Sequence, residues 1–293
     1  MTLEKNDAAD IAHRFLSARR AAASLPAYPG EMPSSVEEAY AIQDAAIAAW
    51  NQPIIGWKVG RVPAALVSRF GTERIAGPIF ASRTALAAGG EVEMPVFDKG
   101  FAAAEAEFLL RIGRQPDPAQ TRFTLEEAAD MVDAVHIGIE IASSPLRAIN
   151  ELGPVAIVSD FGNNNGLVVG PGIADWQTSG FETWPVSTFI DGVEVGTGKA
   201  TGFPNGAIGA ARFLFELMAR RGIALEPGQW ISSGAVSGVH DARPGQSIEA
   251  RFADKMQVRC RLVAAAPFPV EKRVGELLEP GARRASSDGQ RTS

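Results

Sequence analysis

The sequence predicts an α+β protein in which a rolled, mixed β-sheet follows a small N-terminal α/β unit. Two observations lead to this prediction. Apolar residues at helical spacing dominate the first fifty residues, whereas short strand-like runs bounded by glycine and proline recur from residue 54 to residue 263. One long helical pattern interrupts these runs, so the regular alternation of strands and helices in a doubly wound fold is missing.

Helices are expected at three places. The first covers residues 7–20 and the second covers residues 36–50, and both belong to the N-terminal unit. At the start of the second helix, Ser35 stands three residues before Glu38, which is the spacing of a capping box. The third helix is expected over residues 205–221, and a glycine follows it.

Strands are expected where apolar and β-branched residues form short runs between turn-forming residues. One run contains Asp191-Gly192, a two-residue signal for a β-hairpin. A closed or rolled sheet accommodates so many strands with few helices. The expected strands cover residues 54–59, 89–94, 104–111, 135–141, 166–170, 187–195, 230–233, 247–252 and 256–263.

Length and composition fit either one large domain or one small and one larger folded unit. The chain has 293 residues, 46% of them hydrophobic, which is enough for a substantial core. We expect residues 1–75 to form the small N-terminal unit and residues 76–270 to form the rolled sheet domain. Residues 271–293 hold no core-forming side chain beyond Pro280 and are expected to be a disordered tail.

Charge and hydropathy exclude several classes of protein. The net charge is −6 and no basic stripe stands out, so nucleic acid is not an expected partner. No run reaches the roughly eighteen apolar residues of a membrane span, and the acidic start does not fit a signal peptide. We therefore expect a cytoplasmic protein without a membrane partner. The single cysteine, Cys260, alternates with apolar neighbours and is expected in the core.

Three glutamates lie within apolar strand segments: Glu105, Glu107 and Glu140. Strand side chains alternate between faces, so Glu105 and Glu107 share a face at a spacing of roughly 7 Å. An ionised carboxylate in an apolar environment loses several kcal/mol of hydration unless it is paired or bound to a cation. A solvated strand face is the alternative. The small neighbours Ala103 and Gly138, which leave room for a ligand, favour a metal site.

Six segments follow one another in an order that carries a family resemblance: Glu38-Ala-Tyr-Ala-Ile-Gln43, Gly56-Trp-Lys-Val-Gly60, Gly77-Pro-Ile-Phe80, Ala104-Glu-Ala-Glu-Phe108, Ile139-Glu-Ile141 and the stretch 196–234. Together they resemble the 2-keto-4-pentenoate hydratase and 4-oxalocrotonate decarboxylase branch of the fumarylacetoacetate hydrolase superfamily. The similarity covers roughly residues 34–263.

This resemblance implies a fold, a cofactor and site residues. The implied fold is a rolled mixed β-sheet domain preceded by a small α/β unit, and such proteins usually form homo-oligomers. Glu105, Glu107 and Glu140 are implied as ligands of Mg²⁺ or Mn²⁺. Lys58 is implied as the residue that moves protons near the substrate.

These residue types suit that chemistry. Oxygen ligands select a hard cation, and three carboxylates leave about three of six octahedral positions for water or a chelating 2-oxo acid. Lys58 lies in a segment flanked by glycines, next to Trp57, where burial would lower its pKa towards neutrality and let it act as acid and base. The alternative is an ordinary surface lysine.

The chain departs from the family pattern at positions near the expected site. The family's acidic loop is replaced by Arg74-Ile-Ala, and its Ser-Gly-Ser turn reads Ser233-Gly-Ala. We therefore expect slow hydration of the simple monoacid, each lost polar contact being worth roughly 1–3 kcal/mol. If the loop closes over the site, Arg74 can pair with a second carboxylate and favour a dicarboxylate substrate.

Four polar residues complete the set of candidates for substrate contact or support of the site. His136 shares a face with Glu140 and is either such a residue or a structural histidine. Asp160 is expected to fix a loop at the site, although Asp and Asn clusters ordinarily form turns. Ser233 is expected to contact substrate or water. Lys199 either meets a substrate carboxylate or is a solvated lysine.

The resulting functional hypothesis is a metal-dependent hydratase of a 2-hydroxy-dienoate or 2-oxo-enoate, as in meta-cleavage aromatic catabolism. One alternative is a decarboxylase of a 4-oxalocrotonate-type 2-oxo diacid. Another is a C–C hydrolase of acylpyruvates, although the His and Glu pair that such enzymes use to activate water is not found in the sequence. A catalytically silent binding protein of the same fold is the last alternative.

Overall fold

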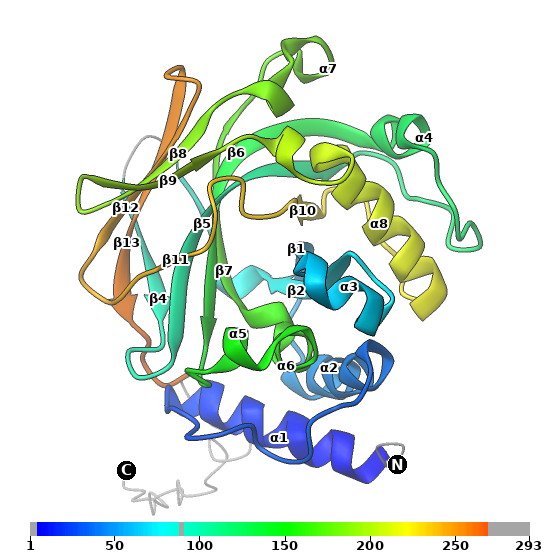
Figure 1. Cartoon of the computed structure of the whole chain (residues 1–293), viewed down its shortest axis with the longest axis vertical. Coiled ribbons are helices and arrows are strands. Elements are labelled where there is room, and N and C mark those ends of the chain that lie inside the picture. The colour runs from blue at the N-terminus through cyan, green and yellow to red at the C-terminus, as the bar shows by residue number, and fades with distance from the viewer. Residues whose placement is uncertain (1–4, 88–90, 269–293) are drawn as a thin grey trace, which may run out of the picture.

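The structure is a computed structural model of the whole chain, and it describes residues 5–87 and 91–268. The tail expected over residues 271–293 lies outside the described residues. Within them, a sheet roll makes up most of the molecule and two N-terminal helices lie side by side at one end (Figure 1). No helix in the described ranges is long and apolar enough to cross a membrane.

The two N-terminal helices are confirmed. They are α1 (Lys5–Ala21) and α2 (Val36–Trp50). The Ser35 hydroxyl accepts a hydrogen bond from the backbone N–H of Glu38 at 3.2 Å, which caps the first turn of α2. Apolar side chains of both helices, including Phe15 and Ile42, form a cluster with Phe101 and Ala103 on the adjoining sheet. The helix pair therefore covers one end of the sheet.

The larger sheet has eight strands among the described residues, and it is mixed. Its main path runs β2-β1-β10-β5-β6-β7-β3, and β11 pairs with β5 beside β10. The β1 and β10 pair and the β3 and β7 pair are parallel, and the other pairs are antiparallel. The strands are β1 (Ile54–Arg61), β2 (Arg74–Phe80), β3 (Thr84–Leu86), β5 (Phe101–Ile112), β6 (Val132–Ser144), β7 (Asn164–Gly172), β10 (Trp230–Ser232) and β11 (His240–Asp241).

The second sheet has five strands in the order β4-β13-β12-β8-β9. It packs against the first sheet around a shared apolar core, where the rings of Phe108 in β5 and Phe252 in β12 have centroids 5.2 Å apart. Asp191 and Gly192 both have positive φ, as a type I′ hairpin turn requires, and they join β8 to β9. Cys260 is buried in this core as expected. The strands are β4 (Val92–Val96), β8 (Val186–Ile190), β9 (Val193–Gly198), β12 (Ser247–Phe252) and β13 (Met256–Ala264).

The predicted rolled mixed sheet is thus confirmed, and the long helix is confirmed as α8 (Gly206–Arg221). Several shorter elements lie outside the sequence prediction because three to seven residues give too little periodicity to read. The predicted domain boundary at residues 75 and 76 falls inside β2, which pairs with β1 in the main sheet. The shorter helices are α3 (Ala64–Phe70), α4 (Leu125–Asp130), α5 (Ile149–Leu152), α6 (Pro154–Ser159), α7 (Trp176–Ser179) and the 3₁₀ turns η1 (Ala81–Arg83), η2 (Phe161–Asn163), η3 (Phe181–Thr183) and η4 (Ala200–Gly202).

Candidate metal centre

Strands β5 and β6 bring the three candidate glutamates together. Their antiparallel register places Glu105 directly opposite Glu140, and Glu107 opposite Gly138. All three side chains are buried, and one carboxylate oxygen from each lies within 4.8 Å of the others. Even-numbered residues of β5, such as Phe108, point into the core of the roll. The three carboxylates therefore lie on the opposite face of the sheet. The group could hold a metal ion.

The hydrogen bonds around these carboxylates leave two oxygens unsatisfied. Oε2 of Glu107 accepts hydrogen bonds from the Ser232 hydroxyl at 2.5 Å and from the Gly234 N–H at 2.9 Å. Oε1 of Glu140 accepts one from the Asn164 amide at 2.8 Å. Oε1 of Glu107 and Oε2 of Glu140 are buried without a hydrogen-bond partner. Buried carboxylate oxygens without a hydrogen-bond donor are rare, and a cation ligated by both would satisfy them.

Burial and the nearby negative charge of Glu140 raise the pKa values of Glu105 and Glu107 in the metal-free protein. Burial raises the pKa of Glu107 to about 7, and the negative charge of Glu140 adds to the rise, while the hydrogen bonds from Ser232 and Gly234 oppose it. The pKa of Glu105 is raised well above its usual range, first by burial and then by Glu140. A divalent cation would act in the opposite direction, because positive charge favours the ionised form.

Lys58 lies beside the glutamates, on β1. Its side chain is buried, its Nζ donates a hydrogen bond to Oδ1 of Asn163 at 3.0 Å, and the same Nζ lies 3.4 Å from Oε2 of Glu140. The sequence-based expectation of a lowered pKa is wrong for the metal-free protein. Burial alone would lower the pKa of Lys58, but the carboxylates, led by Glu140, outweigh burial and raise the pKa above its usual range. Lys58 is therefore an ammonium ion here.

Two asparagines hold these charged groups, although the sequence pattern indicates only turn residues at their positions. Asn163 binds Lys58, and Asn164 binds Glu140. Ser232, which binds Glu107, also lies outside the candidates taken from the sequence. These residues carry no local signal for their partners, which are 24 to 125 positions away. The run of three consecutive asparagines is the one feature that marks the segment as unusual.

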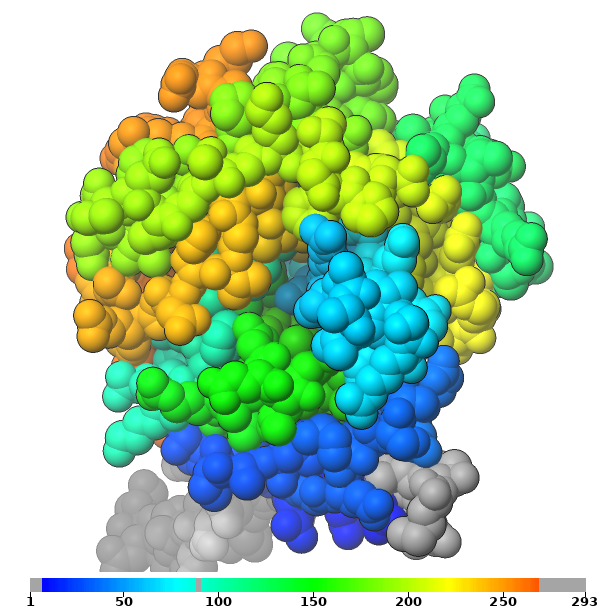
Figure 2. Space-filling view, viewed as in Figure 1, coloured from blue at the N-terminus to red at the C-terminus, as the bar shows by residue number. Residues whose placement is uncertain are grey.

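A cavity of about 590 Å³ reaches Lys58 and Glu105 from the surface. Figure 2 shows the face hollowed between the segments near Arg61, Asn150 and Val239, which line this cavity. The volume suits a small-molecule ligand. Glu105 is the one carboxylate among its described lining residues, and Arg61 and Lys199 bring positive charge to it.

Other candidate residues lie away from this cavity. Arg74 does not lie on a loop over the site, because it begins strand β2 and its buried guanidinium donates hydrogen bonds to the backbone carbonyls of Pro204 at 2.9 Å and Gly206 at 3.1 Å. The main-chain O of Ser233 is 3.4 Å from the same guanidinium. Neither Arg74 nor Ser233 lines the cavity. The geometry thus gives no support to a contact between Arg74 and a substrate carboxylate.

His136 and Asp160 lie in structural surroundings. Nδ1 of His136 is 2.8 Å from the carbonyl oxygen of Gly170, and its ring packs edge-on against Trp230 with centroids 4.9 Å apart. His136 does not line the cavity. Asp160 is buried in an ion pair with Arg19, at the start of the segment that carries Asn163. Lys199, by contrast, is exposed and lines the cavity.

No family model and no curated protein sequence matches the chain, but solved structures match its fold. One is 4-oxalocrotonate decarboxylase from Pseudomonas putida G7 complexed with calcium and acetate, with a TM-score of 0.73 and 20% identity over 89% of this chain and 99% of that chain. A complex of the same enzyme with magnesium and adipate gives a TM-score of 0.73 and 18% identity over the same shares.

A further match is fumarylpyruvate hydrolase from Pseudomonas aeruginosa in complex with Mn²⁺ and pyruvate. It gives a TM-score of 0.53 and 17% identity over 73% of this chain and 91% of that chain. The chain therefore has the fold of the fumarylacetoacetate hydrolase superfamily, and the resemblance found in the sequence is confirmed at the level of the fold.

Proposed function

We propose that this chain is an enzyme that uses Mg²⁺ or Mn²⁺ to act on a small unsaturated 2-oxo acid. The observation that carries the proposal is the group of buried carboxylates Glu105, Glu107 and Glu140, of which Glu105 lines the cavity and the other two each keep an oxygen without a hydrogen-bond partner. With Lys58, the ionised group has three negative charges and one positive charge. One divalent cation neutralises the two remaining negative charges. Carboxylate oxygens are ligands that hard cations such as Mg²⁺ and Mn²⁺ prefer.

Decarboxylation of a 2-oxo diacid is the reaction that the cavity supports best. Decarboxylation breaks the bond to the distal carboxyl carbon, releases CO₂ and moves the bonding electron pair through the conjugated carbons to the 2-oxo oxygen, which then takes a proton. A bound cation would supply positive charge that polarises the 2-oxo group. We propose that the Lys58 ammonium, which lines the cavity, stabilises the developing negative charge and supplies that proton. No general base is required.

The absence of a base disfavours the other reactions. Adding water to a double bond or to a carbonyl group needs a group that takes a proton from water. Among the described residues that line the cavity, Glu105 is the one carboxylate and there is no histidine. This argues against the acylpyruvate hydrolase alternative in particular. Hydration of a 2-hydroxydienoate is the second candidate, favoured by the hydroxyls of Thr197 and Ser237, which line the cavity and can bind a water.

The second carboxylate of a diacid has suitable partners in Arg61 and Lys199. Both line the cavity, and neither makes an ion pair with any residue in the described ranges. An unpaired guanidinium can bind a carboxylate through two parallel hydrogen bonds. We therefore assign to Arg61 and Lys199 the contact with a second carboxylate that the sequence predicts for Arg74. The matched decarboxylase complexed with adipate shows that a protein of this fold binds a dicarboxylate.

The test is a reaction panel with purified protein stripped of metal and then supplied with Mg²⁺ or Mn²⁺. Unsaturated 2-oxo diacids, 2-hydroxydienoates and acylpyruvates are followed by ultraviolet absorbance, and CO₂ release is measured in parallel. We expect metal-dependent CO₂ release from a diacid. Turnover that chelation leaves unchanged, or no reaction with any of these compounds, would contradict the proposal. Cytoplasmic location and assembly into a homo-oligomer stay predictions from the sequence.

A further inference from the structure

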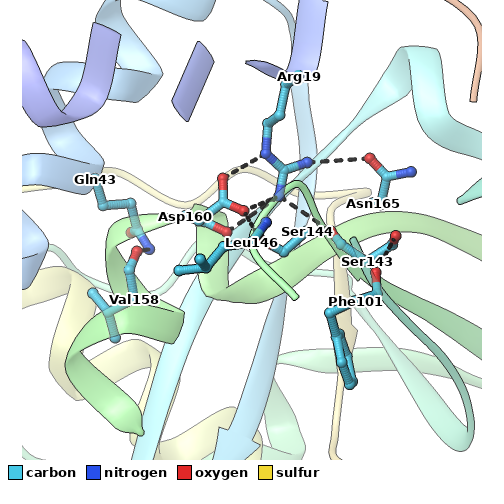
Figure 3. A network of polar contacts seen from close by, with 9 residues as sticks. All are labelled: Arg19, Gln43, Phe101, Ser143, Ser144, Leu146, Val158, Asp160 and Asn165. Atoms are coloured by element: carbon cyan, nitrogen blue, oxygen red, sulfur yellow. Dashed lines mark hydrogen bonds and ion pairs between the residues drawn. The ribbon is translucent and has the colours of Figure 1, made fainter. Parts of the chain in front are cut away.

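A buried ion pair lies outside the cavity and joins the N-terminal helix to the metal centre. Arg19 of α1 and Asp160 are both almost fully buried, and neither lines the cavity (Figure 3). Nε of Arg19 lies 2.5 Å from Oδ1 of Asp160, and its NH2 lies 2.9 Å from Oδ2. The Ser144 hydroxyl donates a third hydrogen bond to Asp160 at 2.6 Å. The planar guanidinium thus meets the carboxylate through two parallel hydrogen bonds.

The same guanidinium also binds Asn165, at the other end of the segment 160–165. Its NH1 donates to Oδ1 of Asn165 at 3.1 Å, and its NH2 also lies 3.3 Å from the carbonyl oxygens of Ser143 and Asp160. Figure 3 shows Arg19 between Asp160 on one side and Asn165 on the other. The side-chain amide of Asn165 in turn donates a hydrogen bond to the carbonyl oxygen of Pro95 at 2.6 Å. One side chain therefore fixes both ends of a six-residue segment.

The residues between these two ends are the ones that hold the metal centre. Asn163 accepts the hydrogen bond of Lys58, and Asn164 donates to Glu140. Their amides touch the charged groups directly, whereas Arg19 touches neither Lys58 nor Glu140. Two routes lead from Arg19 to the site: the segment 160–165, which includes Asn163 and Asn164, and the end of β6, where Arg19 contacts the Ser143 carbonyl oxygen on the strand that carries Glu140.

The backbone of this segment needs external support. Phe161, Gly162 and Asn163 have φ values of 57°, 67° and 55°, three left-handed residues in succession, and this conformation is unfavourable for Phe and Asn. On one side the turn packs tightly against β2, where a Cβ on Gly77 would lie 2.1 Å from the Phe161 carbonyl oxygen. At the ends of the segment, Arg19 supplies the support.

We propose that Arg19 is a positioning residue for the metal centre: it holds the strained segment 160–165 so that Asn163 and Asn164 fix Lys58 and Glu140. This inference deepens the proposed function and rests on it. A lysine keeps the charge but has a single nitrogen, so it cannot bind Asp160 through two parallel bonds and reach Asn165 at the same time. A buried ion pair is weak evidence for a purely stabilising role, because desolvation offsets much of its attraction.

The test compares Mn²⁺ dissociation constants, measured by calorimetry, for the wild type, Arg19→Lys, Asn164→Ala and the double variant. We expect Arg19→Lys to weaken Mn²⁺ binding about tenfold, at the lower end of the range for partners of metal ligands. Because Arg19 acts through Asn164, the double variant should bind no more weakly than Asn164→Ala alone. Arg259→Lys is the control, since it disturbs the Arg259 and Glu249 ion pair on the second sheet, away from the site, and should leave Mn²⁺ binding unchanged.

Two results would overturn the inference: wild-type Mn²⁺ affinity in Arg19→Lys, or the full tenfold loss repeated on top of Asn164→Ala. If Arg19→Lys does not fold, Asn165→Ala takes its place, because it removes one of the contacts of Arg19. Asn165→Ala should then weaken Mn²⁺ binding about threefold. Unchanged Mn²⁺ affinity in this variant would overturn the inference. A wild type that binds neither Mn²⁺ nor Mg²⁺ contradicts the proposed function instead. In that case hydrogen exchange decides, because Arg19→Lys must then speed exchange at residues 161–165 more than in the core of the roll.

Discussion

Glu105 and Glu140 face each other across the antiparallel strands β5 and β6, with both side chains withdrawn from solvent. Like charges at directly opposed positions of a strand pair destabilise a sheet. Here Glu107 is added two residues along the same face, and Lys58 supplies the nearest positive charge. The arrangement is therefore unfavourable with all three carboxylates ionised unless another cation joins them.

The first prediction concerns thermal stability. Saturating Mn²⁺ should raise the melting temperature of the wild type, because a ligand that binds only the folded state stabilises it. Glu107→Gln should abolish this rise, since it removes one charged ligand while keeping the shape of the side chain. Differential scanning calorimetry with and without Mn²⁺ gives the comparison. Glu249→Gln is the control, because Glu249 forms an ion pair with Arg259 on the second sheet. This variant should retain the Mn²⁺-dependent rise in melting temperature. A rise of equal size in Glu107→Gln would contradict the assignment of ligands.

The second prediction concerns pH. In the metal-free protein the folded-state pKa of Glu107 is raised to about 7 by burial and Glu140, and that of Glu105 is raised as well. Between about pH 4.5 and 7 the folded state then binds more protons than the unfolded state, so stability falls as pH rises through this range. Lys58 does not contribute there, because its pKa lies far higher in both states.

Urea unfolding at several pH values between 4.5 and 8, with a chelator and then with Mn²⁺, checks this expectation. The chelated protein should lose stability towards neutral pH. The stability of the Mn²⁺-loaded protein should fall less over this pH range, or rise. The reason is that the cation competes with protons for the carboxylates and binds more tightly as pH rises. A metal-free protein whose stability rises steadily from pH 5 to pH 7 would show that the glutamates are ionised without a cation.

Sequence patterns predict the parts of this site that lie on regular strands. Glu105 and Glu107 share a face because strands alternate with period two, and no tertiary information is needed for that. The same reasoning correctly places the apolar residues at even-numbered positions of β5 in the core. The convergence of Glu140 with them depends on the register of β5 against β6, which the resemblance implies and the strand pattern alone does not.

Residues on irregular backbone could not be placed in this way. Asn163 and Asn164 follow a turn with three left-handed residues, whose path has no periodic signal. Arg19 meets Asp160 across 141 positions of sequence, and nothing near Arg19 distinguishes it from other helical arginines. Arg74 shows the reverse error, since its replacement of an acidic family position suggests a role in the site, whereas its guanidinium binds backbone carbonyls.

The third prediction assigns Lys58 to catalysis rather than to metal binding. Lys58→Ala should lower kcat by roughly a hundredfold or more, the range for groups that transfer protons in the transition state. Mn²⁺ binding should not weaken, because the substitution removes a positive charge 3.4 Å from Glu140. Steady-state kinetics and calorimetry on the same preparation separate the two effects. An unchanged kcat, or a loss of Mn²⁺ binding large enough to explain the loss of rate, would remove Lys58 from the proposed chemistry.

The last prediction concerns the choice of substrate. Arg61 and Lys199 both line the cavity without an ion-pair partner in the described part of the chain, so they are free to bind the distal carboxylate of a diacid. Charge-assisted hydrogen bonds of this kind contribute about 1.5–3 kcal/mol, or roughly 10 to 100-fold in an equilibrium constant. The double variant Arg61→Ala with Lys199→Ala should therefore weaken the binding of a saturated 2-oxo diacid, which cannot react, by about that factor, and leave the binding of the corresponding 2-oxo monoacid almost unaffected, with both dissociation constants measured by calorimetry. Arg74→Lys is the matched control, because Arg74 binds backbone carbonyls and any loss there should be the same for both acids. Equal losses of affinity for diacid and monoacid in the Arg61 and Lys199 double variant would show that these cations do not bind the second carboxylate.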